Sequence, residues 1–260
     1  MKKFVALLLA VLMVASLCAC GQKDTGSDLQ TVTKGKLIMS TNAEFAPYEY
    51  VADDGKGFQG TGYEGIDIEI AYALAQKLGL ELVVDNMDFD AALSAVQTGK
   101  SDMVAAGVTV TPDRLNAMSF TDSYANGVQV VIVKEGSGIK SIDDLQGKKI
   151  GTQRGTTGFL YCSDDFGDDN VIGFDDGATA VQNLKAGKID CVVIDNVPAQ
   201  EYVKANPGLT ILDTEYANED YAIGIAKDNT ALQEALNKAL AELKADGTIQ
   251  SIIDKYIPAK

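Results

Sequence analysis

Two kinds of hydrophobic pattern alternate along most of the chain. Short apolar runs, as long as buried strands, are followed by stretches in which apolar residues recur every three or four positions, as in amphipathic helices. Residues 36–107 thereby predict three strands and two helices in alternation: strand 36–41, helix 66–78, strand 80–85, a helix from about 88–90 to Gly99, and strand 102–107. Such alternation predicts a parallel sheet covered by helices on both faces.

Residues 149–195 repeat this order in a shorter form. The predicted elements are strand 149–152, a helix that opens at 155–157, strand 170–174, helix 177–187 and strand 191–195. The turns repeat as well, because Gly99-Lys100-Ser101-Asp102 precedes one strand and Gly187-Lys188-Ile189-Asp190 precedes another. We therefore expect two α/β lobes of similar build, and a single continuous sheet is the alternative.

The C-terminal region predicts two further amphipathic helices that have no counterpart after the first lobe. Leucines at 232, 236, 240 and 243 form one stripe, and isoleucines at 249, 252 and 253 form the next. We expect these helices to cross back onto the first lobe. The predicted fold class is α/β, with two similar three-layer lobes, a two-segment hinge near 123–130 and 215–223, and a ligand cleft between the lobes. Lobe 1 would comprise 36–125 and 220–260, and lobe 2 would comprise 126–219.

The N-terminal segment has a different composition. Lys2 and Lys3 precede an apolar run from Phe4 to Ala15, which predicts a secretory signal peptide over residues 1–19. The run is short for a membrane span of about 20 residues. Leu17-Cys18-Ala19-Cys20 resembles the bacterial lipobox, which implies acylation of Cys20 after cleavage; a signal peptide without lipidation is the alternative. Residues 20–35 are polar and small, so they predict a flexible tether.

Composition excludes several classes of function. The net charge of −15 argues against nucleic acid, whose binding proteins carry clustered cations. The chain has no histidine, which removes histidine-activated nucleophiles and histidine metal sites. It also lacks the glycine-rich motifs of dinucleotide and phosphate binding. We therefore expect no cofactor, no metal and no enzymatic activity.

Two cysteines lie outside the N-terminal segment. Cys162 and Cys191 could form a disulfide outside the cytoplasm, or could be two buried thiols that pack as small hydrophobic side chains.

Polar side chains gather just after predicted strands, where ligands bind in open α/β folds. These segments are 42–48, 107–114, 153–157 and Asp195. One of them contains Arg114, and the chain has only one other arginine, Arg154.

In this order and spacing, residues 36–256 resemble the bacterial extracellular solute-binding proteins of the polar amino-acid family. These are the receptors of ABC importers. The resemblance is carried by the motifs 44–49, 62–67, Phe89, 107–114, 155–157, Asp195 and 245–256. It implies the type II periplasmic-binding fold and a monomer anchored by lipid outside the cytoplasm. It also implies a free amino acid as ligand, with permease and ATPase components as partners.

The resemblance further implies a clamp for an amino-acid zwitterion. Arg114 would hold the α-carboxylate with its planar fork, assisted by Thr157 at a helix N-terminus. The α-ammonium would go to Asp195, the Gly107 carbonyl and the Thr109 hydroxyl. Many relatives carry serine where this chain has Gly107. The full set of candidate ligand-binding residues is Glu44, Phe45, Phe89, Gly107, Thr109, Arg114, Gln153, Thr157 and Asp195.

Each of these residues also has a structural interpretation. Arg114 could form a surface ion pair with Asp113, the two phenylalanines could belong to the core, Thr157 could cap a helix, and Asp195 could stabilise a turn. Glu44 would suit a cationic ligand, whereas an inward-facing Arg154 would favour an acidic one. Two other functions stay open: a dehydratase of cyclohexadienyl acids on the same scaffold, and the ligand-binding component of a sensor.

Overall fold

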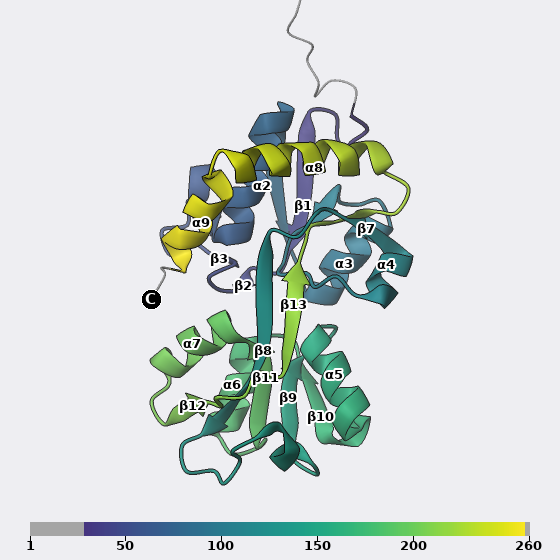
Figure 1. Ribbon diagram of the computed structural model, residues 1–260. Coiled ribbons are helices and arrows are strands. Elements are labelled where there is room, and N and C mark those ends of the chain that lie inside the picture. Colours follow the sequence, from purple (N-terminus) through teal and green to yellow (C-terminus); the bar gives the residue numbers. More distant parts are fainter. Residues whose placement is uncertain (1–28, 258–260) are drawn as a thin grey trace, which may run out of the picture.

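The computed structural model describes residues 29–257, whose elements form two α/β lobes, one above the other in Figure 1. The predicted signal peptide, Cys20 and most of the predicted tether lie outside the described residues. No helix within the described range is both long enough and apolar enough to cross a bilayer.

Lobe 1 is built on a five-stranded sheet of order β5-β1-β6-β14-β7. β1 pairs in parallel with β5 and β6, and β14 pairs antiparallel with β6 and β7. The strands are β1 (Lys36–Thr41), β5 (Glu81–Asn86), β6 (Met103–Val104), β7 (Met118–Phe120) and β14 (Gly224–Ala226).

Helices cover both faces of this sheet. Neighbouring strand residues point to opposite faces, so Met103 joins the core under α2 while Val104 joins the core under α3. The helices of this lobe are α2 (Ile66–Leu78), α3 (Phe89–Gln97), α4 (Pro112–Ala117), α8 (Thr230–Ala245) and α9 (Thr248–Tyr256). The result is the predicted three-layer arrangement.

A small antiparallel sheet of order β2-β3-β4 follows β1 and was not predicted. Its strands are β2 (Glu44–Phe45), β3 (Glu49–Val51) and β4 (Tyr63–Glu64), with the 3₁₀ turn η1 (Phe58–Gly60) between the last two. This sheet leads the chain from β1 to the start of α2.

Lobe 2 has the same strand order as lobe 1 in its first four positions, β10-β9-β11-β8, with β12 at the edge. β9 pairs in parallel with β10 and β11, and β8 pairs antiparallel with β11 and β12. The three strands predicted in each lobe are parallel, as expected, and a returning strand, β14 or β8, joins each sheet in the opposite direction. The elements are β8 (Ala125–Lys134), η2 (Ile142–Leu145), β9 (Ile150–Gln153), α5 (Thr157–Phe166), η3 (Asp168–Asn170), β10 (Val171–Phe174), α6 (Gly177–Lys185), β11 (Cys191–Asp195), α7 (Asn196–Ala205), β12 (Leu209–Ile211) and β13 (Ala217–Tyr221).

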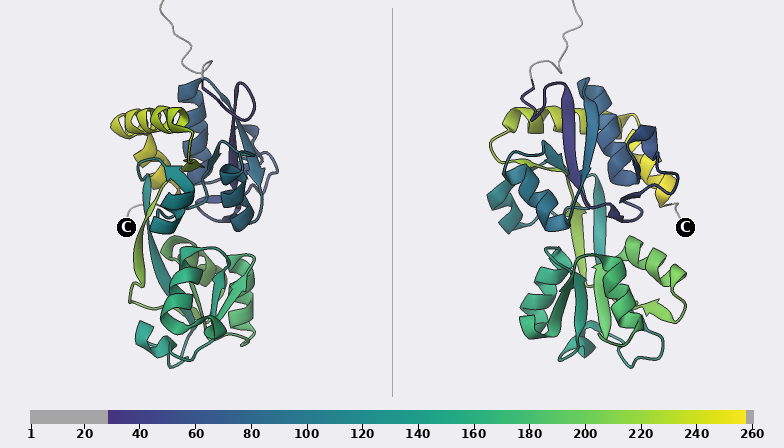
Figure 2. Two further views of the ribbon diagram at one scale, coloured as in Figure 1. Left: turned by 90° about the vertical axis from the view of Figure 1, so that its right-hand side faces the viewer. Right: turned by 180° about the vertical axis from the view of Figure 1, so that it is seen from behind.

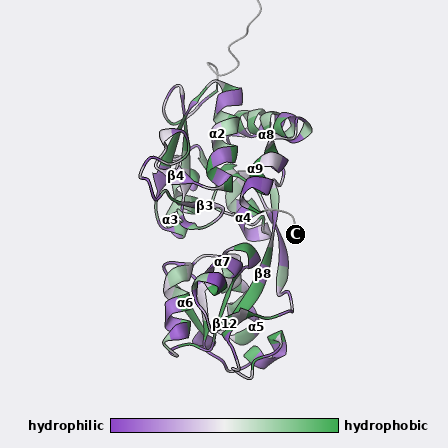
Figure 3. Cartoon of the chain, turned by 90° about the vertical axis from the view of Figure 1, so that its left-hand side faces the viewer, coloured by the Kyte–Doolittle hydropathy of each residue, from purple (hydrophilic) through white to green (hydrophobic). Residues whose placement is uncertain are grey.

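Two paired strands join the lobes. β8 and β13 run antiparallel, with Ala125 opposite Tyr221 and Gln129 opposite Ala217. Figure 2 shows them side by side between the lobes, and Figure 3 shows β8 as hydrophobic over much of its length. They coincide with the predicted crossing segments, so the polypeptide passes between the lobes at a two-stranded hinge.

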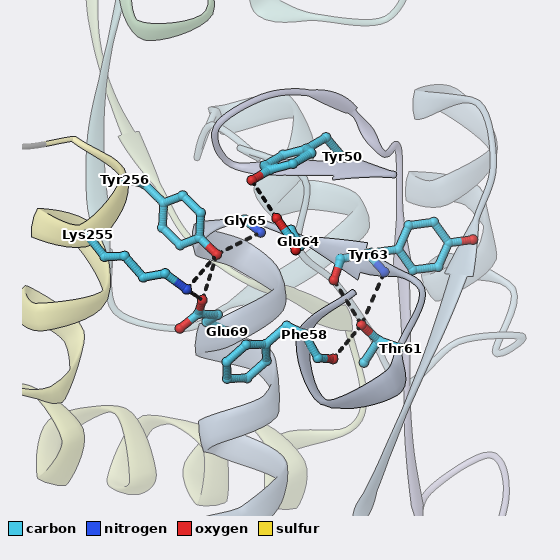
Figure 4. A network of polar contacts seen from close by, with 9 residues as sticks. All are labelled: Tyr50, Phe58, Thr61, Tyr63, Glu64, Gly65, Glu69, Lys255 and Tyr256. Atoms are coloured by element: carbon cyan, nitrogen blue, oxygen red, sulfur yellow. Dashed lines mark hydrogen bonds and ion pairs between the residues drawn. The ribbon is translucent and has the colours of Figure 1, made fainter. Parts of the chain in front are cut away.

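The C-terminal helices return to lobe 1, as the sequence predicted. The leucine stripe of α8 is buried in the same core as the apolar face of α2. α9 is fastened to the N-terminus of α2, because the Tyr256 hydroxyl donates to Glu69 Oε1 at 2.6 Å and accepts from the Gly65 N–H at 3.3 Å (Figure 4). Lys255 forms an ion pair with the same carboxylate.

Cys162 in α5 and Cys191 in β11 are free, buried thiols of one hydrophobic cluster in lobe 2. Of the two alternatives for this pair, the structure has the buried thiols.

Candidate ligand-binding site

One pocket is lined by residues of both lobes and of the hinge. Its lining contains all but one of the nine predicted site residues; the exception is Glu44. The lining residues are Asn42, Phe45, Glu49, Phe89, Ala106, Gly107, Thr109, Arg114, Gln129, Gln153, Thr156, Thr157, Val193, Ile194, Asp195 and Tyr221.

Arg114 reaches the pocket from the short helix α4. The helix begins at Pro112 and is capped by Thr111, whose hydroxyl accepts the Arg114 N–H at 3.2 Å. The guanidinium donates to the Thr109 carbonyl at 2.9 Å and, across the cleft, to the Gly155 carbonyl at 3.1 Å. Its carbon lies 5.4 Å from the centre of the Phe89 ring. Burial lowers the pKa of Arg114, and within residues 29–257 no carboxylate lies within ion-pair distance. The guanidinium therefore holds a partly desolvated positive charge with N–H groups still unused.

Asp195 supplies the opposite charge from lobe 2. It ends β11 and caps α7, and the residue is 1% exposed. One carboxylate oxygen accepts the Val197 N–H at 2.9 Å; the other accepts the Val128 N–H and the Tyr221 hydroxyl, each at 3.0 Å. Burial raises the pKa of Asp195 to about 6, and these hydrogen bonds limit the rise. In the described part of the chain, no lysine or arginine forms an ion pair with it.

The pocket thus combines a cation and an anion that do not neutralise each other. Buried charges are usually paired, since an isolated one is costly to desolvate. A small molecule that carries both signs would pair with both groups at once.

Gly107 lines the same pocket as these two charges. Its φ of 53° is in the left-handed region, and an added Cβ would lie 2.9 Å from a ring carbon of Phe45. A serine at this position would require the Phe45 ring to move. The Gly107 N–H donates to the carboxylate of Asp67 at 2.9 Å.

Two buried threonines meet across the cleft. The hydroxyls of Thr109 and Thr157 are 3.4 Å apart, and Thr157 is the first residue of α5. The cap of α5 is Thr156, whose hydroxyl accepts the Phe159 N–H at 3.3 Å. Thr157 is therefore free of the capping role that its position in the sequence allowed.

Two amide side chains form another contact between the lobes. Gln153 Nε2 donates to Asn42 Oδ1 at 2.9 Å and to the Asp175 carbonyl at 3.0 Å. Asn42 Nδ2 donates to the Met87 carbonyl at 3.0 Å. Both hydrogens of the Gln153 amide are committed, which leaves its carbonyl oxygen as an acceptor.

Glu44 and Arg154 lie outside the pocket. Adjacent residues of a strand point to opposite sides, so β2 presents Phe45 to the pocket and leaves Glu44 exposed beside Tyr202. Arg154 is exposed, forms an ion pair with Asp175 and donates to the Gly173 carbonyl at 2.6 Å. It does not turn inward.

Sequence reasoning missed several lining residues. Asn42 and Glu49 lie in the segments 42–48 and 44–49 that the sequence singled out, but they were not among the candidate residues, and Gln129 and Tyr221 are strand positions without a local signal. The return of the chain through the hinge brings Gln129 and Tyr221 to the pocket, and no local pattern records it. Within residues 29–257, no three acidic or cysteine side chains are grouped as metal ligands.

Known proteins share this architecture. Residues 37–259 match the family described as bacterial extracellular solute-binding proteins, family 3. The arginine-binding extracellular protein ArtP of Bacillus subtilis (strain 168) is 34% identical over 266 residues, which cover 98% of each chain.

Solved structures agree with the sequence comparison. An ancestral arginine-binding protein bound to glutamine has a TM-score of 0.80 and 39% identity, and the match covers 87% of this chain and 100% of that one. An ancestral arginine-binding protein bound to arginine has a TM-score of 0.78 and 40% identity, with 86% and 99% covered. These relatives are binding proteins, so the dehydratase alternative finds no support in them. The chain belongs to the bacterial extracellular solute-binding proteins of family 3.

Proposed function

We propose that the protein binds one free amino acid between its lobes and delivers it to the permease of an ABC importer. The observation that carries the proposal is the pair of uncompensated charges in one pocket, Arg114 from lobe 1 and Asp195 from lobe 2. An amino-acid zwitterion offers a carboxylate to the first and an ammonium to the second.

Each group then has a defined role. Arg114 binds the α-carboxylate with its unused N–H groups, and the Thr157 hydroxyl and the N-terminus of α5 assist it. Asp195 binds the α-ammonium together with the Gly107 carbonyl and Thr109. Phe45 and Phe89 enclose the ligand's side chain. Because the contacts come from both lobes, the ligand stabilises the closed arrangement.

The ligand's side chain is a hydrogen-bond donor. The contact between Asn42 and Gln153 leaves acceptor oxygens at the pocket, and the amide hydrogens of Gln153 are already bonded. Arg154, which could have met an acidic side chain, is neutralised by Asp175. Among the residues that line the pocket, no cation besides Arg114 is left for the side-chain carboxylate of glutamate or aspartate.

Acidic residues from both lobes favour a cationic side chain over a neutral one. Burial raises the pKa of Glu44, and the nearby charges of Asp176, Asp88 and Asp175 raise it further. With Asp175 paired to Arg154, the carboxylates of Glu44, Asp88 and Asp176 give this edge of the cleft a negative potential, which attracts a guanidinium or ammonium. We therefore propose arginine as the first candidate, in line with the names of the relatives, and glutamine as the second.

The location of the protein follows from its family. Family 3 proteins act outside the cytoplasm, and we propose that acylated Cys20 anchors this one to the membrane as a monomer. A permease and an ATPase are the proposed partners for transport. A sensor would bind the same ligand and pass the signal to a different partner.

A thermal-shift panel tests the binding class. The soluble form without residues 1–20 is unfolded and refolded to remove carried ligand, then heated with each of the twenty amino acids, ornithine and citrulline. A ligand at 100 times its dissociation constant stabilises by about 2.7 kcal/mol. We expect the largest shift with L-arginine, a smaller one with its neutral analogue citrulline, and none with glutamate or aspartate.

The panel can contradict the proposal at two levels. A larger thermal shift with glutamate than with arginine would overturn the proposal that the ligand's side chain is a hydrogen-bond donor. The proposed clamp for the zwitterion would remain. No response to any amino acid would overturn the clamp itself.

A further inference from the structure

Two buried carboxyl groups lie next to each other, and one of them borders the pocket. Glu49 belongs to β3 and is 0% exposed, and Asp67 is the second residue of α2 and is 1% exposed. Glu49 also lines the pocket. The function proposed above uses neither of them.

Donors surround Asp67 on one side only. Its Oδ2 accepts the Gly107 N–H at 2.9 Å and the Tyr124 hydroxyl at 2.8 Å. Its Oδ1 and both oxygens of Glu49 have no hydrogen-bond partner among the described residues. A buried carboxylate without a partner is costly, so these three oxygens require an explanation.

No cation offsets this pair in the described part of the chain, where neither carboxyl forms an ion pair. The ionisable groups that face it are the hydroxyls of Tyr48 and Tyr124, both neutral, and the carboxylate of Asp195 near Tyr48. Two adjacent buried carboxyl groups cannot both be ionised at low cost, so they share a proton.

The proton belongs on Glu49. Two donors already stabilise the ionised form of Asp67, and none stabilises an ionised Glu49. A protonated Glu49 has an O–H that can donate to the vacant Oδ1 of Asp67, which gives a partner to two of the three orphan oxygens at once.

We propose that Glu49 is a positioning residue, kept as a neutral acid, which donates a hydrogen bond to Asp67 and thereby fixes the Gly107 loop of the binding site. This inference rests on the proposed function, in which the Gly107 carbonyl accepts the ligand's ammonium. Asp67 also holds Tyr124, the residue before hinge strand β8, so the same hydrogen-bonded unit joins the ligand loop to the hinge.

The electrostatics agree with this assignment. Burial, followed by the charge of Asp67, raises the pKa of Glu49 well above its ordinary value. Burial raises the pKa of Asp67 to about 6, and the bonds from Gly107 and Tyr124 limit that rise. At neutral pH the pair therefore carries one proton, on Glu49.

A rival role for Glu49 makes the opposite prediction. An ionised Glu49 could pair directly with the ligand's ammonium, and Glu49→Gln would then remove a charge that binding needs. In the role proposed here, the glutamine of this variant keeps both a donor for Asp67 and the size of the side chain, so the substitution is tolerated.

The first test uses the ligand-free protein, so it does not depend on which amino acid binds. Infrared difference spectra at neutral pH compare the wild type with Glu49→Gln. We expect a protonated-carboxyl C=O band in the wild type that is absent from Glu49→Gln and retained in Glu64→Gln. Glu64 is the matched control, since it lies in the same small sheet, outside the pocket. Absence of the band from the wild type would overturn the proposal.

The second test measures binding of L-arginine, and of L-glutamine as a second probe, by calorimetry. We expect Glu49→Gln to stay within about three-fold of the wild type and Glu49→Leu to bind about ten-fold more weakly, because Leu leaves Asp67 Oδ1 without a donor. Glu49→Gln should also lose less affinity than the wild type from neutral to alkaline pH, because both weaken as the ligand's ammonium deprotonates and only the wild type weakens further as Glu49 ionises.

A ten-fold or greater loss in Glu49→Gln would establish the rival role. If Glu49→Leu fails to fold, the infrared band and the pH profile of Glu49→Gln still decide the question. If neither probe binds the wild type, the proposed function is at fault and the infrared result stands alone.

Discussion

The carboxylate of Asp195 should make ligand binding depend on pH. Its ionised form binds the ammonium, and its pKa before binding is about 6. The bound ammonium lowers this pKa, so binding below about pH 6 must release a proton. We therefore expect the affinity for L-arginine to be constant between this pH and neutrality and to fall by up to ten-fold per unit below it, as measured by calorimetry.

The pKa of Asp67 is also about 6, so its titration must be distinguished from that of Asp195. Asp195→Asn binds more weakly at every pH, but the decline through pH 6 should disappear. If the same decline persists in Asp195→Asn, Asp67 is the group that titrates and the assignment to Asp195 is wrong.

Arg114 should contribute by geometry as well as by charge. Arg114→Ala leaves the ligand's carboxylate unpaired in a desolvated site, so we expect an affinity loss of about 2–5 kcal/mol. Arg114→Lys keeps the charge but loses the planar fork, so its affinity should fall between those of the wild type and Arg114→Ala. Calorimetric titration with L-arginine measures both variants, and unchanged binding in Arg114→Ala would remove this residue from the site.

For single residues, the sequence predicted which side chains would gather at the ligand site, but it did not predict which of two neighbouring side chains would face the pocket. Phe45 and Glu44 are neighbours in one motif, and only the pairing of β2 with β3 decides which of them faces the pocket. Thr156 and Thr157 are likewise adjacent, and the first turn of α5 assigns the cap to Thr156. The binding roles of the residues that do line the pocket stay predictions.

Among the elements, the C-terminal cap of helix α2 can be tested separately from the binding site. Gly79 caps its C-terminus with a φ of 68°, and a Cβ there would meet no heavy atom within 4 Å. Gly79→Ala should therefore lower the free energy of unfolding by about 1 kcal/mol through backbone strain alone. Gly79→Asn should cost less, because asparagine tolerates this conformation better. Denaturant titration measures both.

If Gly79→Ala and the wild type had equal free energies of unfolding, alanine would adopt the left-handed conformation of this cap without strain, and the prediction would be wrong. Binding of L-arginine should be unaffected in both variants, since Gly79 lies outside the pocket.

Elements with a long period were predictable, and short ones were not. The helices α2 and α8 repeat apolar residues over several turns; the predicted ends of α2 agree with the structure, and the predicted leucine stripe lies within α8. The strands of the small sheet have two or three residues each, too few to show alternation, and α4 has six. β6 is shorter than the predicted strand 102–107 and leaves the chain free to turn at Gly107. These segments take their form from tertiary pairing.

For the molecule as a whole, the repeated order of elements was sufficient to predict two lobes and a hinge. It could not reveal that β14 and β8 enter their sheets antiparallel, because strand direction within a sheet depends on where the chain returns. The same return places Tyr221 beside Asp195. The order of elements therefore predicts a pocket between the lobes, but no single element shows which hinge residues line it.

The arrangement of the lobes leads to the last prediction. Among residues 29–257, four hydrogen-bonding contacts span the cleft: Arg114 with Gly155, Gln153 with Asn42, Thr109 with Thr157, and Tyr202 with the Glu44 carbonyl. The structure is therefore of the closed form. A ligand held by both lobes must favour this form over an open one, since an equilibrium shifts only by the difference in affinity for its two states.

Small-angle scattering can measure this shift. We expect the ligand-free protein to have a larger radius of gyration than the closed structure, and L-arginine to reduce it to that of the closed structure. Arg114→Ala serves as the control, because at the concentration that saturates the wild type it should stay open. Calorimetric binding of arginine to the wild type without any change in the radius of gyration would contradict closure, because the lobes would then be closed before the ligand arrives. In that case the contacts between Gln153 and Asn42 and between Arg114 and Gly155 would be sufficient to hold the cleft shut, and the ligand would need a transient opening to enter.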